Sequence, residues 1–194
     1  MPSDFVILEP DTTSHQHRSR LLEGMAVAVS QKGYADTTIA DIVREASVSR
    51  RTFYEHFSTK AECLVALYTA ASHNALKVLR EAIDPGRGWE QQLEAGIRAY
   101  LGCMAANPVL LRTLFVEILH LGPEGLAARR HVNQAIADYM VGVVNTPHVT
   151  PQVAMAVVGG IHELVLQAIE DGQVDELPVL TTTATALVRA VARA

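Results

Sequence analysis

Residues 38–57 contain two short amphipathic patterns that only three residues separate. Within residues 39–46, apolar side chains recur at intervals of three and four, which places them on one face of a helix. In the second pattern, Phe53 and Phe57 lie one helical turn apart. Helices this short are marginal in isolation, so they must pack on each other and on a further element. The segment therefore predicts a helix-turn-helix.

Side chains that can cap helices mark the ends of these two patterns. Thr38 and Asp41 have the spacing of a capping box, and Ser49 is placed to cap the second helix. Residues 47–49 read Ser-Val-Ser, and serines favour local hydrogen bonds over continuation of a helix. A preceding helical stripe covers residues 18–33 and ends in a glycine, which is suited to stop it. Three consecutive helices are therefore expected.

The rest of the chain also has helical rather than strand patterns. Aromatic residues make up only 5% of the chain, and β-branched runs bounded by turns are scarce. A long helix is expected to begin at Lys60, and segments with Gly and Pro divide the remaining residues. Five further helices are expected at 89–106, 108–121, 124–145, 151–171 and 177–193. Together these patterns predict an all-α fold of about nine helices, with a three-helix module followed by a helical bundle.

The distribution of charge indicates two modules. Residues 14–60 contain seven Lys and Arg against five Asp and Glu, a net charge of +2. The whole chain has a net charge of −5, so the remainder carries −7. Only the first module is suited to approach phosphate groups. We therefore expect an amino-terminal arm at 1–14, a helix-turn-helix domain at 15–60 and a second domain at 61–194.

The sequence predicts a cytoplasmic protein without a membrane span. The first fourteen residues lack the basic start and long apolar stretch of a secretory signal. The longest apolar stretch, at 153–161, is about half the roughly 20 residues that cross a bilayer. Cys63 and Cys103 lie in apolar helical patterns without metal-binding spacing, so buried, reduced thiols are expected.

The second helix of a helix-turn-helix enters the major groove of DNA. Here that helix begins with Arg50 and Arg51 and carries hydroxyl and imidazole groups on its outer faces. Such groups can hydrogen-bond phosphates and base edges, so double-stranded operator DNA is a predicted partner. The same pattern also fits an ordinary charged surface of a helical protein.

The segment "TTIADIVREASVSRRTFYEHFSTKAECLVALY" resembles the DNA-binding region of the tetracycline-repressor (TetR) family of bacterial transcriptional regulators. Together with the preceding helix, the resemblance covers about 45 residues. It implies phosphate contacts by Thr38, Ser49, Tyr54 and Lys60. It implies contacts at or near base edges by Arg50, Arg51, Thr52 and His56.

Two positions depart from the family pattern. Ser47 stands where the family usually has glycine, and if the turn needs a positive φ, serine costs about 1 kcal/mol. Arg51 stands where the family often has a small residue. Its guanidinium can read guanine, bind a phosphate, or pair with Glu55 one turn further along.

The last two expected helices are apolar around much of their circumference. The apolar residues, too many for one core, are Val153, Met155, Val157, Val158, Ile161, Leu164, Val165, Leu166, Ile169, Leu180, Ala184, Leu187, Val188 and Val191. A second subunit would cover the excess, and Gly159 and Gly160 would permit close helix approach, although a contact inside one chain is an alternative. The TetR resemblance implies a four-helix interface, so we expect a homodimer through residues 151–193.

A mostly apolar cavity for a hydrophobic small-molecule effector is expected among residues 89–121 and 124–171. Bulky apolar and isolated polar side chains recur there, and ligand sites are typically apolar with a few orienting polar groups. The candidate lining residues are Tyr100, Met104, Phe115, Leu119, His120, Tyr139 and His162.

Glu117 and His120 have the Glu-x-x-His spacing of di-iron helical bundles, which raises the question of an enzyme. Such a site needs a second copy of the spacing, and the sequence has none. A glycine-rich phosphate loop and a nucleophile with its base are also missing, so metal, cofactor and catalysis are not expected.

These patterns and the resemblance predict a homodimeric transcriptional regulator, a repressor that a ligand releases from its operator. The resemblance implies that ligand binding in the second domain changes the separation of the two recognition helices. The alternative is a helical enzyme or small-molecule carrier that retains an unused DNA-binding module. Salt-dependent, sequence-specific binding to DNA would separate the two.

Overall fold

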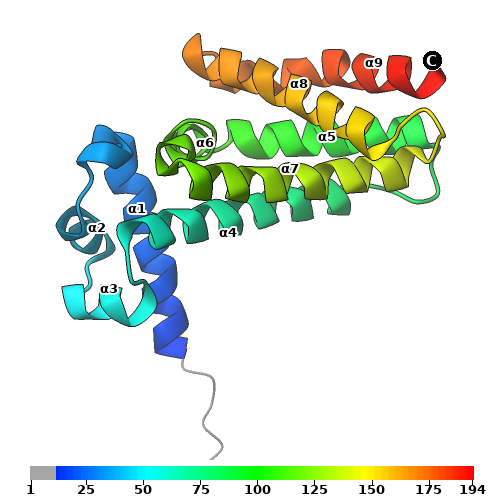
Figure 1. The fold of residues 1–194 in the computed structure, drawn as a ribbon. Coiled ribbons are helices and arrows are strands. Elements are labelled where there is room, and N and C mark those ends of the chain that lie inside the picture. Colours follow the sequence, from blue (N-terminus) through cyan, green and yellow to red (C-terminus); the bar gives the residue numbers. More distant parts are fainter. Residues whose placement is uncertain (1–11) are drawn as a thin grey trace, which may run out of the picture. The chain divides into compact units, whose positions relative to one another are not determined.

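The computed structural model describes residues 12–194, which form helices and connecting loops (Figure 1). Nine α-helices and two short 3-10 helices lie in this part of the chain, and it contains no strand. The expected all-α fold of about nine helices is therefore confirmed for the described residues. Residues 1–11 of the predicted amino-terminal arm lie outside them.

The helices are α1 (Thr12–Asp36), α2 (Ile39–Ala46), α3 (Arg50–His56), α4 (Lys60–Glu81), α5 (Trp89–Ala105), α6 (Pro108–Phe115), η1 (Glu117–Leu121), α7 (Pro123–Val144), α8 (Pro151–Glu170), η2 (Val174–Val179) and α9 (Leu180–Arg193).

The chain divides into two compact units at Leu67 and Tyr68, inside α4. The first unit contains α1, α2, α3 and the start of α4, and the second contains all later helices. The sequence predicts the boundary after residue 60, where α4 begins. The structure instead assigns the first eight residues of this helix, 60–67, to the amino-terminal unit.

The predicted caps of α2 and α3 are confirmed. The Thr38 hydroxyl oxygen accepts a hydrogen bond from the Asp41 amide at 3.2 Å, and Asp41 Oδ2 accepts one from the Thr38 amide at 2.9 Å. Ser49 Oγ accepts from the Thr52 amide at 3.0 Å. These bonds satisfy amide groups that have no partner within the first turn of a helix. The predicted stop at Gly33 is present as a kink in α1, where φ is 76° and ψ is 165°.

The first unit has a small apolar core between its helices. Its fully buried large side chains are Leu21, Met25, Val29, Ile42, Phe53 and Leu64. Gly24 allows α1 and α2 to approach closely, because a Cβ atom there would lie 2.7 Å from the Ile42 carbonyl oxygen and 2.8 Å from the Ala46 amide nitrogen. The close crossing of α1 and α2 therefore leaves no room for a larger residue at position 24.

Three helices differ clearly from their expected bounds. The one expected at 177–193 begins only at Leu180 as α9, after the 3-10 helix η2 (Val174–Val179). Helix α1 begins at Thr12, so residues 12–14 are helical although the sequence places them in the arm. The helix expected at 108–121 divides at Val116, where φ is −110° and ψ is −58°, into α6 and the 3-10 helix η1. A 3-10 helix turns about 120° per residue, against about 100° in an α-helix. Side chains after Val116 therefore point in directions that a continuous α-helix would not give them.

The second unit is a bundle with one continuous apolar core, to which α4, α5, α7, α8 and α9 contribute. Within it, α7 packs against α8 and α5 against α9 (Figure 1). Val158 of α8 and Val188 of α9 are almost fully buried in this core. At the surface, Arg189 and Arg193 both pair with Glu90, which joins the end of α9 to the start of α5.

Helix α8 is longer than the uninterrupted apolar stretch at 153–161, and it is apolar over most of its length. By length and composition alone it could cross a membrane, and so could α5 combined with residues 108–121, a pair bent by 102°. Core helices of globular domains pass the same test, so this is weak evidence for a span. Only 28% of the apolar stretch of α8 is buried within the single chain, so part of the helix surface is open to other contacts.

Ser47, the residue after α2, adopts the left-handed conformation, with φ 51° and ψ 47°. Its side chain is exposed, and its carbonyl oxygen accepts a hydrogen bond from Arg20 Nη2 at 2.9 Å. Because glycine avoids the steric cost of this conformation, we expect Ser47→Gly to raise the free energy of unfolding by about 1 kcal/mol. Ser47→Ala retains the cost, so urea denaturation followed by circular dichroism should rank glycine above alanine. Equal stability of the two variants would contradict a steric cost at this position.

Candidate nucleic-acid interface and ligand cavity

Helix α3 is anchored on one side and exposes polar side chains on the other. Phe53 is fully buried and Phe57, directly after the helix, is almost fully buried. Arg50, Arg51 and Tyr54 are exposed, and 59% of the Tyr54 surface is accessible. Arg50 makes no ion pair with any residue in the described part of the chain. A rigidly held helix with free cationic and hydroxyl groups on its outside can contact a phosphate backbone and base edges.

Arg51 pairs with Glu55, which is one of the contacts that the sequence allows for this residue. Its Nε atom lies 3.1 Å from Glu55 Oε1, and the two side chains are 90% and 54% exposed. Exposed pairs of this kind contribute little to stability. The guanidinium can therefore exchange the Glu55 carboxylate for a phosphate or a base edge at small cost.

The remaining predicted DNA contacts lie around the two ends of α3 and at the start of α2. Thr38 and Ser49 are exposed at the caps of α2 and α3, and Thr52 and His56 are half-buried. The Ser49 and Thr52 hydroxyl groups are hydrogen-bonded to each other at 2.9 Å. The His56 ring lies edge-on to His17 of α1, with 6.4 Å between ring centroids. The contacts of these four residues with DNA stay a prediction.

The ammonium group of Lys60 bonds to carbonyl groups of its own chain. Its Nζ atom donates to the carbonyl oxygens of Tyr34 and Thr37, both at 2.7 Å, and lies 4.2 Å from the Tyr34 ring centroid. Burial lowers the pKa of this ammonium group. The last carbonyl groups of a helix lack backbone partners and attract cations. Lys60 therefore ties the end of α1 to the start of α4, and its phosphate contact stays a prediction.

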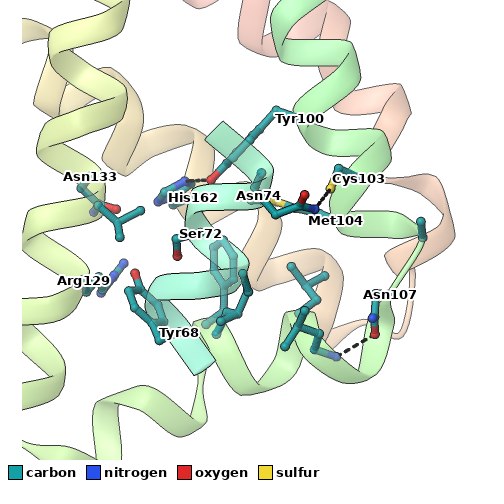
Figure 2. Close-up of a pocket in the computed structure, with 18 residues that line it drawn as sticks. Tyr68, Ser72, Asn74, Tyr100, Cys103, Met104, Asn107, Arg129, Asn133 and His162 are labelled. Atoms are coloured by element: carbon teal, nitrogen blue, oxygen red, sulfur yellow. Dashed lines mark hydrogen bonds between the residues drawn. The ribbon is translucent and has the colours of Figure 1, made fainter. Parts of the chain in front are cut away.

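The second unit contains a cavity of about 340 Å³ (Figure 2). Side chains from α5 and α6 supply most of its apolar wall, and α4 and α7 supply most of its polar groups. Of the residues expected to line a ligand site, Tyr100, Met104, Phe115 and His162 line this cavity.

Tyr100 and His162 form a buried, hydrogen-bonded pair in the cavity wall. The Tyr100 hydroxyl oxygen lies 3.1 Å from His162 Nε2, and the Phe115 ring packs edge-on against His162 with 5.2 Å between centroids. Burial and, after it, the charge of Arg129 lower the pKa of His162 to about 4. Burial raises the pKa of Tyr100 far above its usual value. Both side chains are therefore neutral near pH 7 and act as hydrogen-bonding groups.

Three of the expected lining residues lie elsewhere. Tyr139 lines a second, apolar hollow of about 60 Å³, which shares only Tyr100 and His162 with the larger cavity. Leu119 and His120 line neither space, and the His120 side chain is 54% exposed beside Glu117, with 3.4 Å between Nδ1 and Oε2. The change to 3-10 geometry at residue 116 leaves these two side chains exposed, and their contact with a ligand stays a prediction.

The amino-terminal unit matches a known family. Residues 21–67, from the middle of α1 into α4, match the family described as "Bacterial regulatory proteins, tetR family". The matched stretch contains the whole α2–turn–α3 arrangement and its caps. This unit therefore has the helix-turn-helix of the TetR family.

Curated relatives of this chain are named as regulators. It is 22% identical over 130 residues to the HTH-type transcriptional activator FasR of Mycolicibacterium smegmatis, a match that covers 67% of the chain and 59% of the relative. It is 39% identical over 73 residues to the HTH-type transcriptional regulator TtgR of Pseudomonas putida, which covers 37% of the chain and 35% of the relative. The matched part thus spans about three fifths or less of these relatives.

Solved structures extend the likeness of fold beyond the helix-turn-helix. FadR from Bacillus subtilis, solved in complex with stearoyl-CoA, superposes with a TM-score of 0.78 at 16% identity over 88% of this chain and 96% of that one. A TetR-like transcriptional regulator from Rhodococcus sp. RHA1 superposes with a TM-score of 0.71 at 19% identity over 94% and 98%. The second unit therefore has the helical fold seen in TetR-like regulators.

The polar cavity residues that the sequence did not indicate include Tyr68, Ser72, Arg129 and Asn133. They form two pairs at a spacing of four residues, one on α4 and one on α7, so each pair lies on one helical face. In α4 the pair alternates with Ala71 and Ala75, whose small side chains leave space beside it. Polar pairs among small residues on an otherwise apolar helix face are the signal that could have indicated this wall.

The cysteines and acidic groups give no sign of a metal site. No cluster of three or more His, Cys, Asp or Glu side chains suited to a metal occurs within residues 12–194. Cys63 is fully buried, and burial raises the pKa of its thiol to about 12. Cys103 differs from its expected burial, because it is half-buried and lines the cavity.

The buried His162 makes the stability of the protein depend on pH. Its pKa falls from 6.5 to about 4 on folding, so the unfolded chain binds a proton that the folded chain excludes. Stability is therefore complete above about pH 6.5 and decreases as the pH falls toward 4, by about 3 kcal/mol for this group. Urea denaturation at several pH values should show a weaker dependence in His162→Gln. The exposed His148 is the control, because His148→Gln should retain the wild-type dependence.

Proposed function

We propose that this chain is a dimeric DNA-binding transcriptional regulator whose affinity for DNA responds to a small molecule in the 340 Å³ cavity. The observation that carries the proposal is the α2–turn–α3 unit. In it Phe53 anchors α3 to the core while Arg50, Arg51 and Tyr54 face solvent. Such a helix can enter the major groove with its cationic end leading. The match of residues 21–67 to the tetR family supports the same role.

Within this proposal, the side chains of α3 divide by reach and chemistry. Arg50 and Arg51 stand on the outer face and can bond bidentately to guanine, the commonest specific base contact of arginine. Tyr54 is suited to a phosphate oxygen through its hydroxyl group. Four further residues stay predicted DNA contacts: Thr38, Ser49, Thr52 and His56.

The proposed dimer interface is the outer face of α8 and α9. Ala156 and Gly160 of α8 and Ala186 and Ala190 of α9 are exposed, small side chains. Leu187 beside them keeps 38% of its surface accessible. Small residues allow two helix pairs to approach closely, and the partner would cover the apolar surface that one chain leaves open.

This face is narrower than the sequence pattern indicates. Several apolar residues that the pattern assigns to a subunit interface are instead part of the chain's own core. They are Val157, Val158, Ile161, Val165, Ala184 and Val188. A charged substitution at one of them would test folding rather than dimerisation, so an interface test must use the exposed small residues.

The proposed effector is a small molecule with substantial apolar surface, because apolar side chains make up much of the cavity wall. Binding would shift the equilibrium between states of different DNA affinity, with a coupling of about 1–3 kcal/mol. Release of DNA by the effector, and hence repression, is the simplest form of this coupling. FasR is named as an activator, so transcription assays with and without effector must decide the direction. A cytoplasmic location is part of the same proposal.

Selection of bound duplexes from a random DNA pool tests the function. We expect binding that weakens steeply with salt, together with a preferred sequence. Arg50→Ala should cost about 1–3 kcal/mol at one base position and relax the preference there. Arg98→Ala is the control, because Arg98 is exposed on α5, where it pairs with Glu94. Its preference should equal that of the wild type.

The same selection separates the proposal from its alternative. A helical enzyme or small-molecule carrier with an unused DNA-binding module would bind ligands but show no sequence preference on DNA. Lys60→Ala gives a further distinction, because its ammonium group bonds to the carbonyl groups at the end of α1. We expect this variant to lose stability rather than to change only the salt dependence of DNA binding.

A further inference from the structure

The cavity has a cationic end, formed by α4 and α7. Figure 2 shows the guanidinium group of Arg129 turned toward the hydroxyl group of Tyr68, with Ser72 and Asn133 near it. Arg129 is half-buried, and no carboxylate of the described residues forms an ion pair with it. Arginine stays protonated in proteins. The cavity thus contains a permanent positive charge that residues 12–194 do not neutralise.

The titratable groups that face this charge do not compensate it. Burial and the charge of Arg129 lower the pKa of His162 to about 4, which leaves the imidazole neutral near pH 7. Burial raises the pKa of Tyr68 to about 12, although Arg129 and a hydrogen bond with Ser72 act in the opposite direction. The phenol is therefore neutral as well. Both groups can donate or accept hydrogen bonds, but neither supplies a negative charge.

Asn133 shows that the hydrogen bonds at this end are also incomplete. It lies one turn beyond Arg129 on α7, and its buried Oδ1 atom has no donor among the described residues. Buried polar atoms in folded proteins nearly always have a partner. The polar end of the cavity therefore lacks both a counter-charge and a hydrogen-bond partner from residues 12–194.

We propose that the effector is an organic anion with an apolar body. Its anionic group, such as a carboxylate, pairs with Arg129, and its body lies against the apolar wall that includes Met104, Leu111 and Phe115. The flat, forked guanidinium matches the two oxygens of a carboxylate, and partial burial strengthens such a pair. A volume of about 340 Å³ fits a small ligand of this kind. The inference rests on the proposed ligand-sensing function and specifies its ligand.

Two dyes with the same ring system test the charge requirement on the full chain. Anilinonaphthalene sulfonate and N-phenylnaphthylamine differ by one sulfonate group, and both fluoresce when they enter an apolar site. We expect the wild type to bind the sulfonate at least about ten-fold more tightly than the neutral dye. Arg129→Gln should remove this preference while leaving the affinity for the neutral dye within about two-fold.

Matched variants identify the source of the preference. Arg129→Lys retains the charge and should retain most of the preference. Arg130→Gln removes the same charge from an exposed neighbour on α7 and should bind both dyes as the wild type does. If Arg129→Gln does not fold, Arg129→Met and the wild-type comparison between the two dyes still decide the question.

The outcomes separate this inference from the function on which it rests. Equal binding of the two dyes by the wild type, or an unchanged preference in Arg129→Gln, would overturn the anionic class while leaving an apolar sensor in place. If neither dye enters the cavity, both the anionic class and the apolar effector are rejected. DNA selection tests the regulator itself, so its result stands independently of the dyes.

Discussion

Gly160→Arg is expected to convert the proposed dimer into monomers. A side chain at this position would enter open space, because an added Cβ meets only Leu187 Cδ2, at 3.8 Å, within its own chain. In the dimer, the same arginine would place an unpaired charge in a desolvated contact between helices. Sedimentation velocity should therefore show a folded monomer, with the circular dichroism spectrum of the wild type.

Loss of the dimer should also weaken DNA binding strongly. Two linked recognition helices bind two half-sites together, and separating them lowers the overall affinity by about 10²- to 10⁴-fold. Gly142→Arg is the matched control, because Gly142 is an exposed helical glycine on α7 whose added Cβ would meet no atom within 4 Å. A dimer that persists in Gly160→Arg would place the interface elsewhere on the chain.

Gly24→Ala is expected to disrupt the helix-turn-helix itself. The added methyl group would lie 2.7 Å from the Ile42 carbonyl oxygen and 3.0 Å from the Ala46 Cβ atom. These are backbone and short side-chain atoms, which cannot turn away, so α1 and α2 must move apart. Overpacking of this kind costs about 1–3 kcal/mol, and the displaced α2 should lower DNA affinity as well.

The control for this prediction uses the same substitution at an open site. Gly142→Ala adds a methyl group in a helix without a clash, and the better helix propensity of alanine should raise stability by up to about 1 kcal/mol. Urea denaturation of the two variants should therefore show shifts of opposite sign. Shifts of the same sign and size would contradict the close crossing of α1 and α2.

Local signals in the sequence were sufficient for the helix-turn-helix. The Thr38–Asp41 capping box, the Ser49 cap and the kink at Gly33 depend on residues within one or two turns of each other. Such contacts form wherever the backbone takes the local conformation that these residues favour. Even the strained position of Ser47 could be anticipated, because the turn between α2 and α3 is defined by its neighbours in sequence.

Ser49 and Lys60 differ in how far away along the chain their partners lie. The sequence marks Ser49 as a cap because its partner is three residues away. The partners of Lys60 are carbonyl groups more than twenty residues earlier in the chain. Nothing in the local pattern distinguishes an ammonium group that is free for DNA from one that is bound to the end of α1.

For the ligand cavity, the sequence identified helices but not the direction of most side chains. Tyr100, Met104, Phe115 and His162 line the cavity, whereas Leu119 and His120 turn outward because the helix changes its pitch after residue 116. A change from α to 3-10 geometry depends on packing against other helices, and the periodicity of the sequence does not reveal it. For the same reason the sequence did not single out Arg129 among the arginines, because its place at the cavity depends on how α4 and α7 pack.

The all-α class, the caps and turn of the helix-turn-helix, and the resemblance to TetR regulators could all be read from the sequence, because each depends on residues close together in the chain. The tertiary structure alone decided which side chains of α8 face the core, which ones remain exposed on its small-residue face, and which polar groups meet in the cavity. These properties depend on contacts between residues far apart in the sequence. Packing of the helices buries His162 near the charge of Arg129, and both effects lower the pKa of His162. The same packing brings no carboxylate of the described residues into an ion pair with Arg129.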